Sequence, residues 1–289
     1  MLRTVEEPHR AGLRGPRKAP GAAPRRPSQG ETAMPARTVP VRVLTAVGAV
    51  AVLVAGLSAC ASASDDKDPE HRSFALQGRT LTVDSDDSAL EIVASDDHAS
   101  GKIQVTRWFS GSVAVGSDPE VTWRMDGDRL VLRMHCSGVV ADCAAKHRIE
   151  VPRGVAVKVK EGDGSVRASG FQDALDIRTG DGSVHVTDSS GPLELRTGDG
   201  SVRAAVSSRQ VRAHTGDGSV RLDLGTVPDR VESRSGDGSV TISLPRATYK
   251  VSTDTGDGSV DVSVPTDDAS AHVVDARSGD GKITVRTAN

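Results

Sequence analysis

Apolar and polar residues alternate through the second half of the chain, in short runs that return at a nearly fixed interval. Between Gly180 and Thr197, the run SVHV is followed by the turn-like stretch TDSSGP and then by the run LELRT. Every second residue of a run is apolar, which is typical of a β-strand with one buried face, because successive side chains point to opposite sides. A helix would need apolar positions spaced near 3.6 residues, so the pattern predicts β-structure.

The tripeptide Gly-Asp-Gly separates these runs; it occurs seven times, and six of the copies continue as Ser-Val. Successive copies start 18, 18, 18, 20, 20 and 23 residues apart. Such a short period indicates one small unit stacked on itself. The second residue after each tripeptide forms an inward-pointing ladder, which consists of Val166, Val184, Val202, Val220, Val240, Val260 and Ile283.

Two architectures would suit this repeat: a β-solenoid, in which each coil is hydrogen-bonded to the next, or a series of antiparallel hairpins. Coils in register would place Val above Val and Ser above Ser at a spacing of about 4.8 Å, whereas hairpins would gain nothing from identical repeats. We therefore predict an all-β fold, a single-stranded β-helix or β-solenoid with coils of 18–20 residues.

The same alternation predicts strands in the preceding region, between Phe74 and Lys160, although the regular tripeptide is absent there. We expect it to form an irregular N-terminal β cap in which Trp108, Phe109 and Trp123 fill the end of the core. Sugar stacking by the two tryptophans is the alternative interpretation, and it would require them to be exposed. The expected strands span residues 80–83, 89–94, 102–108, 121–125, 129–134, 148–151 and 155–160.

The tripeptide itself is best explained as a corner of the coil. Asp-Gly favours a positive backbone φ, and an aspartate side chain can hydrogen-bond its own backbone at a turn. Calcium binding is the second interpretation, since stacked coils would align the aspartates in a column about 4.8 Å apart. The column would consist of Asp163, Asp181, Asp199, Asp217, Asp237, Asp257 and Asp280.

The N-terminal part carries an export signal. Residues 43–59 hold no charge, Arg37 and Arg42 precede them, and the stretch ends Leu57-Ser58-Ala59-Cys60, which resembles the lipobox of bacterial lipoproteins. That resemblance implies lipid attachment at Cys60, anchoring to the bacterial cell membrane and an extracytoplasmic location. We expect an extension at 1–33 that is disordered or lies before the true start, a signal peptide at 34–60, a tether at 61–72 and the repeat domain at 73–289. An uncleaved membrane anchor is the alternative.

The remaining cysteines, Cys136 and Cys143, form an isolated pair and predict a disulfide in an exported protein. A zinc site that adds His135 and His147 is the alternative, although its spacing matches no zinc module. The formal net charge is −3, and residues 1–60 contain nine basic and three acidic residues, so residues 61–289 carry −9. That charge argues against a nucleic-acid partner.

The stretch from Ile149 to Val166 joins a strand ending in Pro-Arg-Gly, an alternating strand and the first Gly-Asp-Gly. This arrangement is similar to the β-strand-repeat "putative adhesin" domains of bacterial envelope proteins, a family of unknown function. The resemblance runs from about Phe74 to the end of the sequence. It implies a β-helix displayed on the cell envelope, in some relatives tied to envelope-stress signalling, and it supplies no catalytic residues.

Motifs for common enzyme chemistries are absent from the sequence, which has no P-loop, nucleophile elbow, HExxH or dinucleotide fingerprint. We expect no cofactor, no metal and no catalysis, and a domain that binds an envelope polymer or protein or serves as a scaffold. A polysaccharide-active β-helix enzyme with paired carboxylates, such as Asp223 and Asp261, is one alternative, and a calcium-rigidified spacer is another. Two arginine stripes would form the binding surface or serve only solubility; they are Arg167, Arg203 and Arg221, and Arg178, Arg196 and Arg234.

Overall fold

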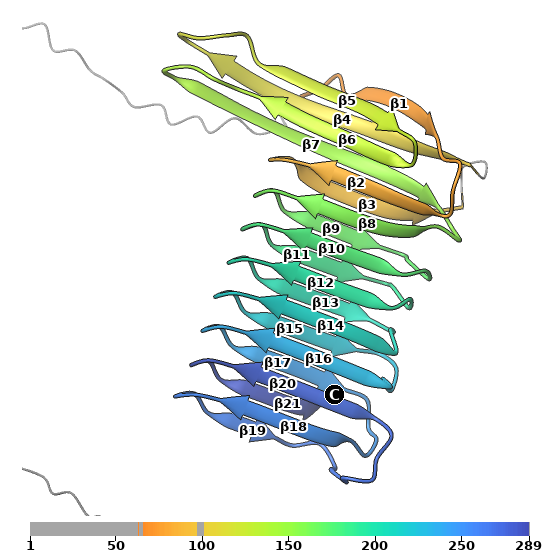
Figure 1. The fold of residues 1–289 in the computed structure, drawn as a ribbon, viewed down its shortest axis with the longest axis vertical. Helices are drawn as coiled ribbons and strands as arrows, with labels where there is room; N and C mark the ends of the chain where they lie inside the picture. The colour runs from red at the N-terminus through yellow and green to blue at the C-terminus, as the bar shows by residue number, and fades with distance from the viewer. Residues whose placement is uncertain (1–62, 64–65, 97–100, 289) are drawn as a thin grey trace, which may run out of the picture. The chain divides into compact units, whose positions relative to one another are not determined.

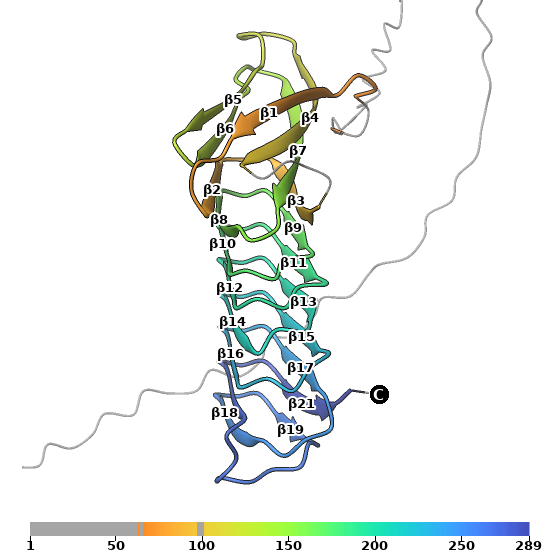
Figure 2. The same cartoon turned by 90° about the vertical axis from the view of Figure 1, so that its right-hand side faces the viewer.

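The computed structural model describes residue 63 and residues 66–96 and 101–288. These residues form twenty-one strands and no α-helix. Each regular repeat contributes one strand to each of two sheets, and Figure 2 shows the two sheets edge-on, facing each other across the core. The prediction of an all-β solenoid is confirmed.

Sheet A contains eleven strands, which lie side by side in the order β1 (Glu70–Ala75), β4 (Lys102–Val113), β7 (Ala141–Pro152), β3 (Ala89–Ser95), β9 (Val166–Ser169), β11 (Val184–Thr187), β13 (Val202–Val206), β15 (Val220–Leu224), β17 (Val240–Leu244), β21 (Ile283–Thr287) and β19 (Val260–Val262). From β7 onward its strand pairs are parallel.

Sheet B contains ten strands, in the order β18 (Lys250–Thr255), β20 (Val273–Ser278), β16 (Arg230–Ser235), β14 (Gln210–Thr215), β12 (Leu193–Thr197), β10 (Leu175–Thr179), β8 (Ala156–Glu161), β2 (Thr80–Ser85), β6 (Arg129–His135) and β5 (Glu120–Asp126). Only its last pair, β5 with β6, is antiparallel. Figure 1 shows the resulting stack of coils.

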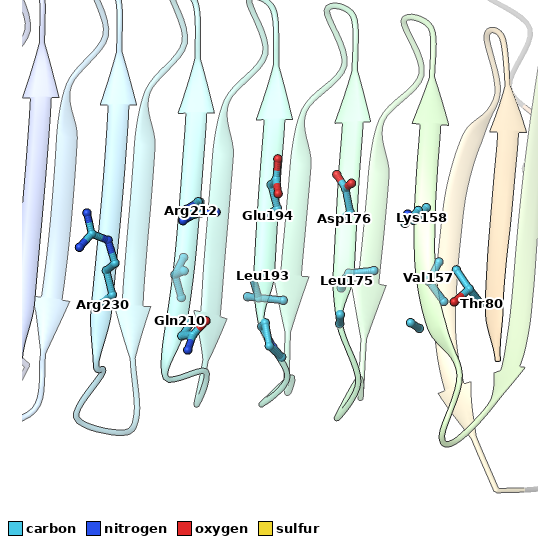
Figure 3. Close-up of a pocket in the computed structure, with 14 residues that line it drawn as sticks. Thr80, Val157, Lys158, Leu175, Asp176, Leu193, Glu194, Gln210, Arg212 and Arg230 are labelled. Atoms are coloured by element: carbon cyan, nitrogen blue, oxygen red, sulfur yellow. The ribbon is translucent and has the colours of Figure 1, made fainter.

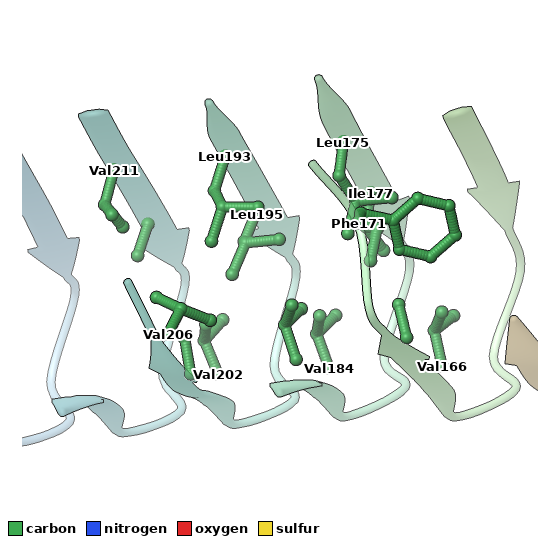
Figure 4. Packing of buried hydrophobic residues seen from close by; sticks show 14 of the residues in the cluster. Val166, Phe171, Leu175, Ile177, Val184, Leu193, Leu195, Val202, Val206 and Val211 are labelled. Carbon is green, nitrogen blue, oxygen red and sulfur yellow. The ribbon is translucent and has the colours of Figure 1, made fainter. Parts of the chain in front are cut away.

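Equivalent residues of neighbouring repeats are paired in register, as the Val ladder predicts. Val184 lies between Val166 and Val202 in sheet A, and Leu193 lies between Leu175 and Val211 in sheet B. All of these side chains are at most 3% exposed and meet between the sheets, as Figure 4 shows. Because adjacent repeats run parallel, the alternative of serial hairpins is wrong.

The glycines of the Gly-Asp-Gly corners are required for a reason other than the expected one. None of them has a positive φ among the described residues. Instead, a Cβ at Gly182 would lie 2.0 Å from the carbonyl oxygen of Gly164, and one at Gly200 would lie 2.1 Å from that of Gly182. Close stacking of one corner on the next leaves no room for a side chain, so the expectation of a positive φ is wrong.

The coils do not all stack in the order of the sequence. The last coil, β20–β21, lies between β16–β17 and β18–β19, so Val240 is paired with Ile283 and not with Val260. At the other end, the first coil, β2–β3, lies between β6–β7 and β8–β9. The expectation that each repeat is hydrogen-bonded to the next one in sequence is therefore wrong at both ends.

The N-terminal cap contains all seven strands expected from the sequence, with β4 and β7 longer than expected. Antiparallel pairs of β1 with β4, β4 with β7 and β5 with β6 close this end of the stack. Trp123 is 7% exposed and packs edge-on against Phe74, with ring centroids 6.2 Å apart. Trp123 therefore fills the core, which excludes it from an exposed sugar-stacking pair.

Cys60, the expected signal peptide and residues 61, 62, 64 and 65 of the expected tether lie outside the described residues. Strand β1 begins at Glu70 and so includes the last three residues of the 61–72 segment. No helix within 66–96 and 101–288 is both long enough and apolar enough to span a membrane.

Candidate functional site

The arginine stripe of sheet B is largely neutralised by a neighbouring row of carboxylates. Arg178 and Arg196 are paired with each other in register, and each lies within 3.2 Å of a Glu194 oxygen. Arg234 pairs with Glu232 at 2.7 Å. These ion pairs are half exposed and contribute little each to stability, but they leave the stripe with little charge for a ligand.

A groove of about 220 Å³ crosses the strand starts of sheet B, as Figure 3 shows. Small side chains from successive coils, namely Ala156, Ala174 and Pro192, are among the residues that line it. The groove brings together two carboxylates of adjacent coils, Asp176 and Glu194, which differ from the expected pair. One Arg178 nitrogen donates to both at 3.2 Å.

The carboxylates named for an enzyme do not form a pair. Asp223 lies on β15 and Asp261 on β19, and β17 and β21 separate these strands in sheet A. That separation corresponds to about 14 Å between the strands. Asp176 and Glu194, the two carboxylates that the groove does bring together, are both held by the Arg178 guanidinium.

The stripe of sheet A differs, because two of its arginines form no ion pair within the described residues. Arg167, His185 and Arg203 follow each other in register on β9, β11 and β13. Arg221 continues the row but donates from Nε to Asp223 Oδ2 at 2.9 Å. Arg167 and Arg203 are both exposed. Positive charge therefore remains uncompensated at the centre of this face.

Glu91 is the residue paired with Arg167 on the neighbouring strand β3, but its carboxylate already forms ion pairs with two other cations. Lys146 Nζ lies 2.8 Å from Glu91 Oε2, and Arg148 Nη1 lies 2.5 Å from Oε1. The hydrogen bond from Lys146, helped by the charges of both cations, lowers the pKa of Glu91 below its usual range. Glu91 therefore stays ionised within its own cluster and leaves Arg167 available.

A polar hollow of about 480 Å³ lies over this row. Besides Arg167, His185 and Arg203 it is lined by three serines that follow the Gly-Asp corners, namely Ser165, Ser183 and Ser201. Each serine lies two residues before one of the three basic residues. The serine row and the basic row therefore both repeat at the strand spacing of about 4.8 Å. The hollow thus presents two guanidinium groups, an imidazole and three hydroxyls, and none of its lining side chains is acidic.

Such a set of donors suits an oxyanion such as phosphate, sulfate or carboxylate, because arginine binds these groups through paired N–H donors. Part of this site was visible in the sequence. The paired arginines have an acid two residues away on the same strand face, as Arg178 has Asp176 and Arg221 has Asp223. Arg167 and Arg203 have serine or alanine at both of those positions.

The aspartates of the Gly-Asp-Gly corners are all exposed on successive coils. Throughout 66–96 and 101–288, no group of three or more His, Cys, Asp or Glu residues is arranged to hold a metal ion. The four residues named for a zinc site are not brought together either. Cys136 and Cys143 are joined in a disulfide, with Cα atoms 6.3 Å apart, and His147 is fully buried in the core.

Two buried titratable groups, His147 and Glu161, were not singled out from the sequence as titrating groups. Both ring nitrogens of His147 lack a hydrogen-bond partner in the described structure, and burial lowers its pKa to about 4. Burial raises the pKa of Glu161 to about 8, although the Ser88 backbone N–H donates to its Oε1 at 3.0 Å. Both side chains are buried inside the stack, do not line the hollow and bear on stability.

A model of the Toastrack DUF4097 family matches residues 58–289, which is most of the chain. The chain belongs to the Toastrack family. The match covers the whole solenoid, the cap and the whole of the expected tether. No curated protein matches the Toastrack chain.

Three solved structures are similar to the Toastrack chain in fold. A putative adhesin from Bacteroides fragilis is 15% identical with a TM-score of 0.46, over 77% of this chain and 98% of that one. A putative adhesin from Parabacteroides merdae is 14% identical with a TM-score of 0.40, over 76% and 96%. A putative cell adhesion protein from Clostridium sporogenes is 14% identical with a TM-score of 0.35, over 76% and 100%.

Proposed function

We propose that this chain is a non-enzymatic, lipid-anchored protein of the bacterial cell envelope whose Toastrack solenoid binds an anionic envelope polymer on sheet A. The observation that carries the proposal is the row of Arg167, His185 and Arg203, which lies under a polar hollow with its two arginines uncompensated. A linear polymer with closely spaced anionic groups fits a row whose donors repeat at about 4.8 Å.

The cellular location rests on the sequence and on the disulfide. The apolar stretch ending in Leu57-Ser58-Ala59-Cys60 supports cleavage before Cys60 and lipid attachment to it. A disulfide between Cys136 and Cys143 is expected outside the reducing cytoplasm. Both features support an extracytoplasmic domain tethered to the cell membrane.

Binding of the full chain to linear polyphosphate, used as a probe, tests the sheet A site. We expect the double substitution Arg167→Gln and Arg203→Gln to weaken binding at least about tenfold, because it removes two charge-assisted contacts. The matched control is Arg178→Gln with Arg196→Gln on sheet B, which removes the same charge from arginines already paired with Glu194. The control should retain most of the affinity.

Equal losses in the two double variants would show that binding follows net charge alone and would contradict a specific site. Binding through the sheet A row should also weaken as salt rises, since exposed charges are screened over about 10 Å at 0.1 M ionic strength. Neutral dextran, a polymer without anionic groups, should not bind.

A further inference from the structure

Strands β4 and β7 form a long arm with an apolar tip. Each has 12 residues, more than any other strand described, and Figure 1 shows them projecting beyond the coils at the cap end. The tip carries three valines that are far more exposed than is usual for this residue: Val115 at 64%, Val139 at 82% and Val140 at 63%. They are the three most exposed large apolar side chains in the described residues.

The arm is built as a rigid element up to this tip. The antiparallel register of Val113 with Ala141 continues to a bridge between Gly116 and Gly138, which places Val115 opposite Val139. The Val139 N–H donates to the Val115 carbonyl at 2.8 Å. Val139 and Val140 lie between Cys136 and Cys143, so the disulfide closes a short loop that contains both valines. The tip is therefore held in place, and its apolar residues do not fold back onto the core.

The segment that leads into the domain, from Asp66 to Ala75, lies beside strand β4 of this arm. Strand β1 runs antiparallel to β4, with Ala75 opposite Lys102 and Glu70 opposite Arg107. Further toward the N-terminus, Asp66 Oδ2 accepts a hydrogen bond from the Phe109 N–H at 2.9 Å. Followed backward, the chain thus moves along β4 toward the tip.

The length of chain before Asp66 nearly equals the length of the arm beyond Phe109. The Asp66 N–H donates to the Ala63 carbonyl at 3.4 Å, so residues 63–66 form a turn that spans less than about 7 Å. The three residues from Ala63 back to Cys60 add at most about 10 Å, so Cys60 can lie about 17 Å from Asp66. Phe109 and Val115 are six residues apart, which corresponds to about 20 Å along the strand. The difference of about 3 Å is small beside the half-thickness of about 15 Å of a bilayer core that an acyl chain spans, so a membrane holding the Cys60 lipid can also meet the tip.

The chemistry of the tip favours the apolar part of a bilayer. Residues 112–118 and 136–143 contain no lysine or arginine, and their only charged side chains are those of Asp118 and Asp142. An anionic polymer or an anionic lipid headgroup has no cation to bind there. Three valines alone give weak membrane affinity, but an anchor on the same membrane makes the contact intramolecular and raises its effective concentration.

We infer that Val115, Val139 and Val140 form a membrane-contacting tip, which inserts into the interfacial region of the bilayer that holds the Cys60 lipid. This inference rests on the lipid anchor of the proposed function. It assigns the β4–β7 arm the task of orienting the solenoid, with the cap toward the membrane and the coils of the anion-binding row beyond it.

The test uses the full, lipidated chain reconstituted into phosphatidylcholine vesicles, with and without brominated acyl chains. A tryptophan is introduced at the tip by Val139→Trp, and its emission is taken as the difference from the unsubstituted chain. The matched control is Val262→Trp, at a valine that is 37% exposed on β19 at the other end of the stack. We expect quenching of the added emission by brominated lipid for Val139→Trp and none for Val262→Trp.

The outcomes distinguish a failure of the tip inference from a failure of the lipid anchor. If the chain floats with the vesicles but the added emission of Val139→Trp is not quenched, the tip inference is overturned and the anchor stands. A blue shift without quenching would mean that protein covers the tip, which also overturns it. If the chain does not float with the vesicles, the anchor fails and the tip inference falls with it. A second variant, Val139→Ser with Val140→Ser, should float normally but leave residues 136–143 less protected from hydrogen exchange on vesicles.

Discussion

Glu161 lies directly opposite Thr179 in the parallel pair of β8 and β10, at the last position before the Gly-Asp-Gly corner. In the regular coils this position is a hydroxyl that ties one corner to the previous one. Thr197 Oγ1, for example, donates to the carbonyl oxygens of Gly180 and Gly182 at 3.1 and 2.8 Å. Glu161 places a carboxyl, 7% exposed, in the same buried column, and its Oε2 has no partner among the described residues.

We expect Glu161→Thr to stabilise the domain, most strongly at high pH. The folded-state pKa of Glu161 is raised by burial from 4.5 to about 8, so folding favours the protonated acid. The cost of burying the charge is absent below pH 4.5, grows between pH 4.5 and about 8, and is constant above that. It amounts to roughly 5 kcal/mol at most. Urea unfolding of both chains at pH 4.5 and pH 9 measures it. A variant no more stabilised at pH 9 than at pH 4.5 would contradict this account.

His147 should limit stability on the acid side. Burial lowers its folded-state pKa from 6.5 to about 4, with a smaller contribution from the charge of Arg107, so folding favours the neutral ring. Stability is therefore lost as pH falls from 6.5 toward 4, by roughly 3 kcal/mol in total. We expect His147→Phe to flatten the pH dependence of the melting temperature over this range. His135→Gln, at an exposed histidine of β6, should leave it unchanged.

The corner glycines should tolerate no side chain. In Gly200→Ala the new Cβ would lie 2.1 Å from the Gly182 carbonyl oxygen, so the two coils must separate locally. We expect a loss of about 2 kcal/mol or more in the free energy of unfolding. The control is Gly225→Ala, whose nearest contact would be the Ser207 hydroxyl at 3.0 Å, and it should lose less than half as much. Similar losses in the two variants would mean that stacking does not require the glycine.

The inserted position of the last coil can be tested by engineered disulfides. Thr241 is paired with Thr284, and Thr284 is paired with Asp261, all on the outer face of sheet A. Cysteines at Thr241 and Thr284 should form a bond in the oxidised protein, because neighbouring strands bring Cα atoms within bonding range. Cysteines at Thr241 and Asp261 would be about 10 Å apart and should remain free. Peptide mapping by mass spectrometry distinguishes the pairs, and the opposite result would restore the order of the sequence.

Local features of this fold could be predicted from the sequence because they depend on residues close together in the chain. Alternation identified the strands, and the fixed phase of Val184 and Val202 identified their register. The order of the end coils could not be predicted, because nearly identical repeats offer nearly identical faces. Nothing in the stretch around Val260 distinguishes a neighbour at Val240 from one at Ile283.

The candidate site was predicted as two equivalent stripes, and the structure separates them. The difference arises from charges beside the arginines on the same sheet face, such as Asp223 beside Arg221. The reason for the corner glycines also depends on contacts between coils 18 residues apart, which a turn-based argument within one repeat does not include.

The insertion of β20–β21 also has a consequence for how the protein is made. The coils from β10–β11 to β16–β17 each pair with the preceding coil and can assemble one after another as the chain is synthesised. Coil β18–β19 is synthesised earlier than its only neighbour in the stack, so its backbone edge stays unsatisfied until residues 273–287 arrive. Residue 287, the end of β21, must therefore have been synthesised before this end of the stack can close, and a chain released early would expose an open sheet edge to other molecules.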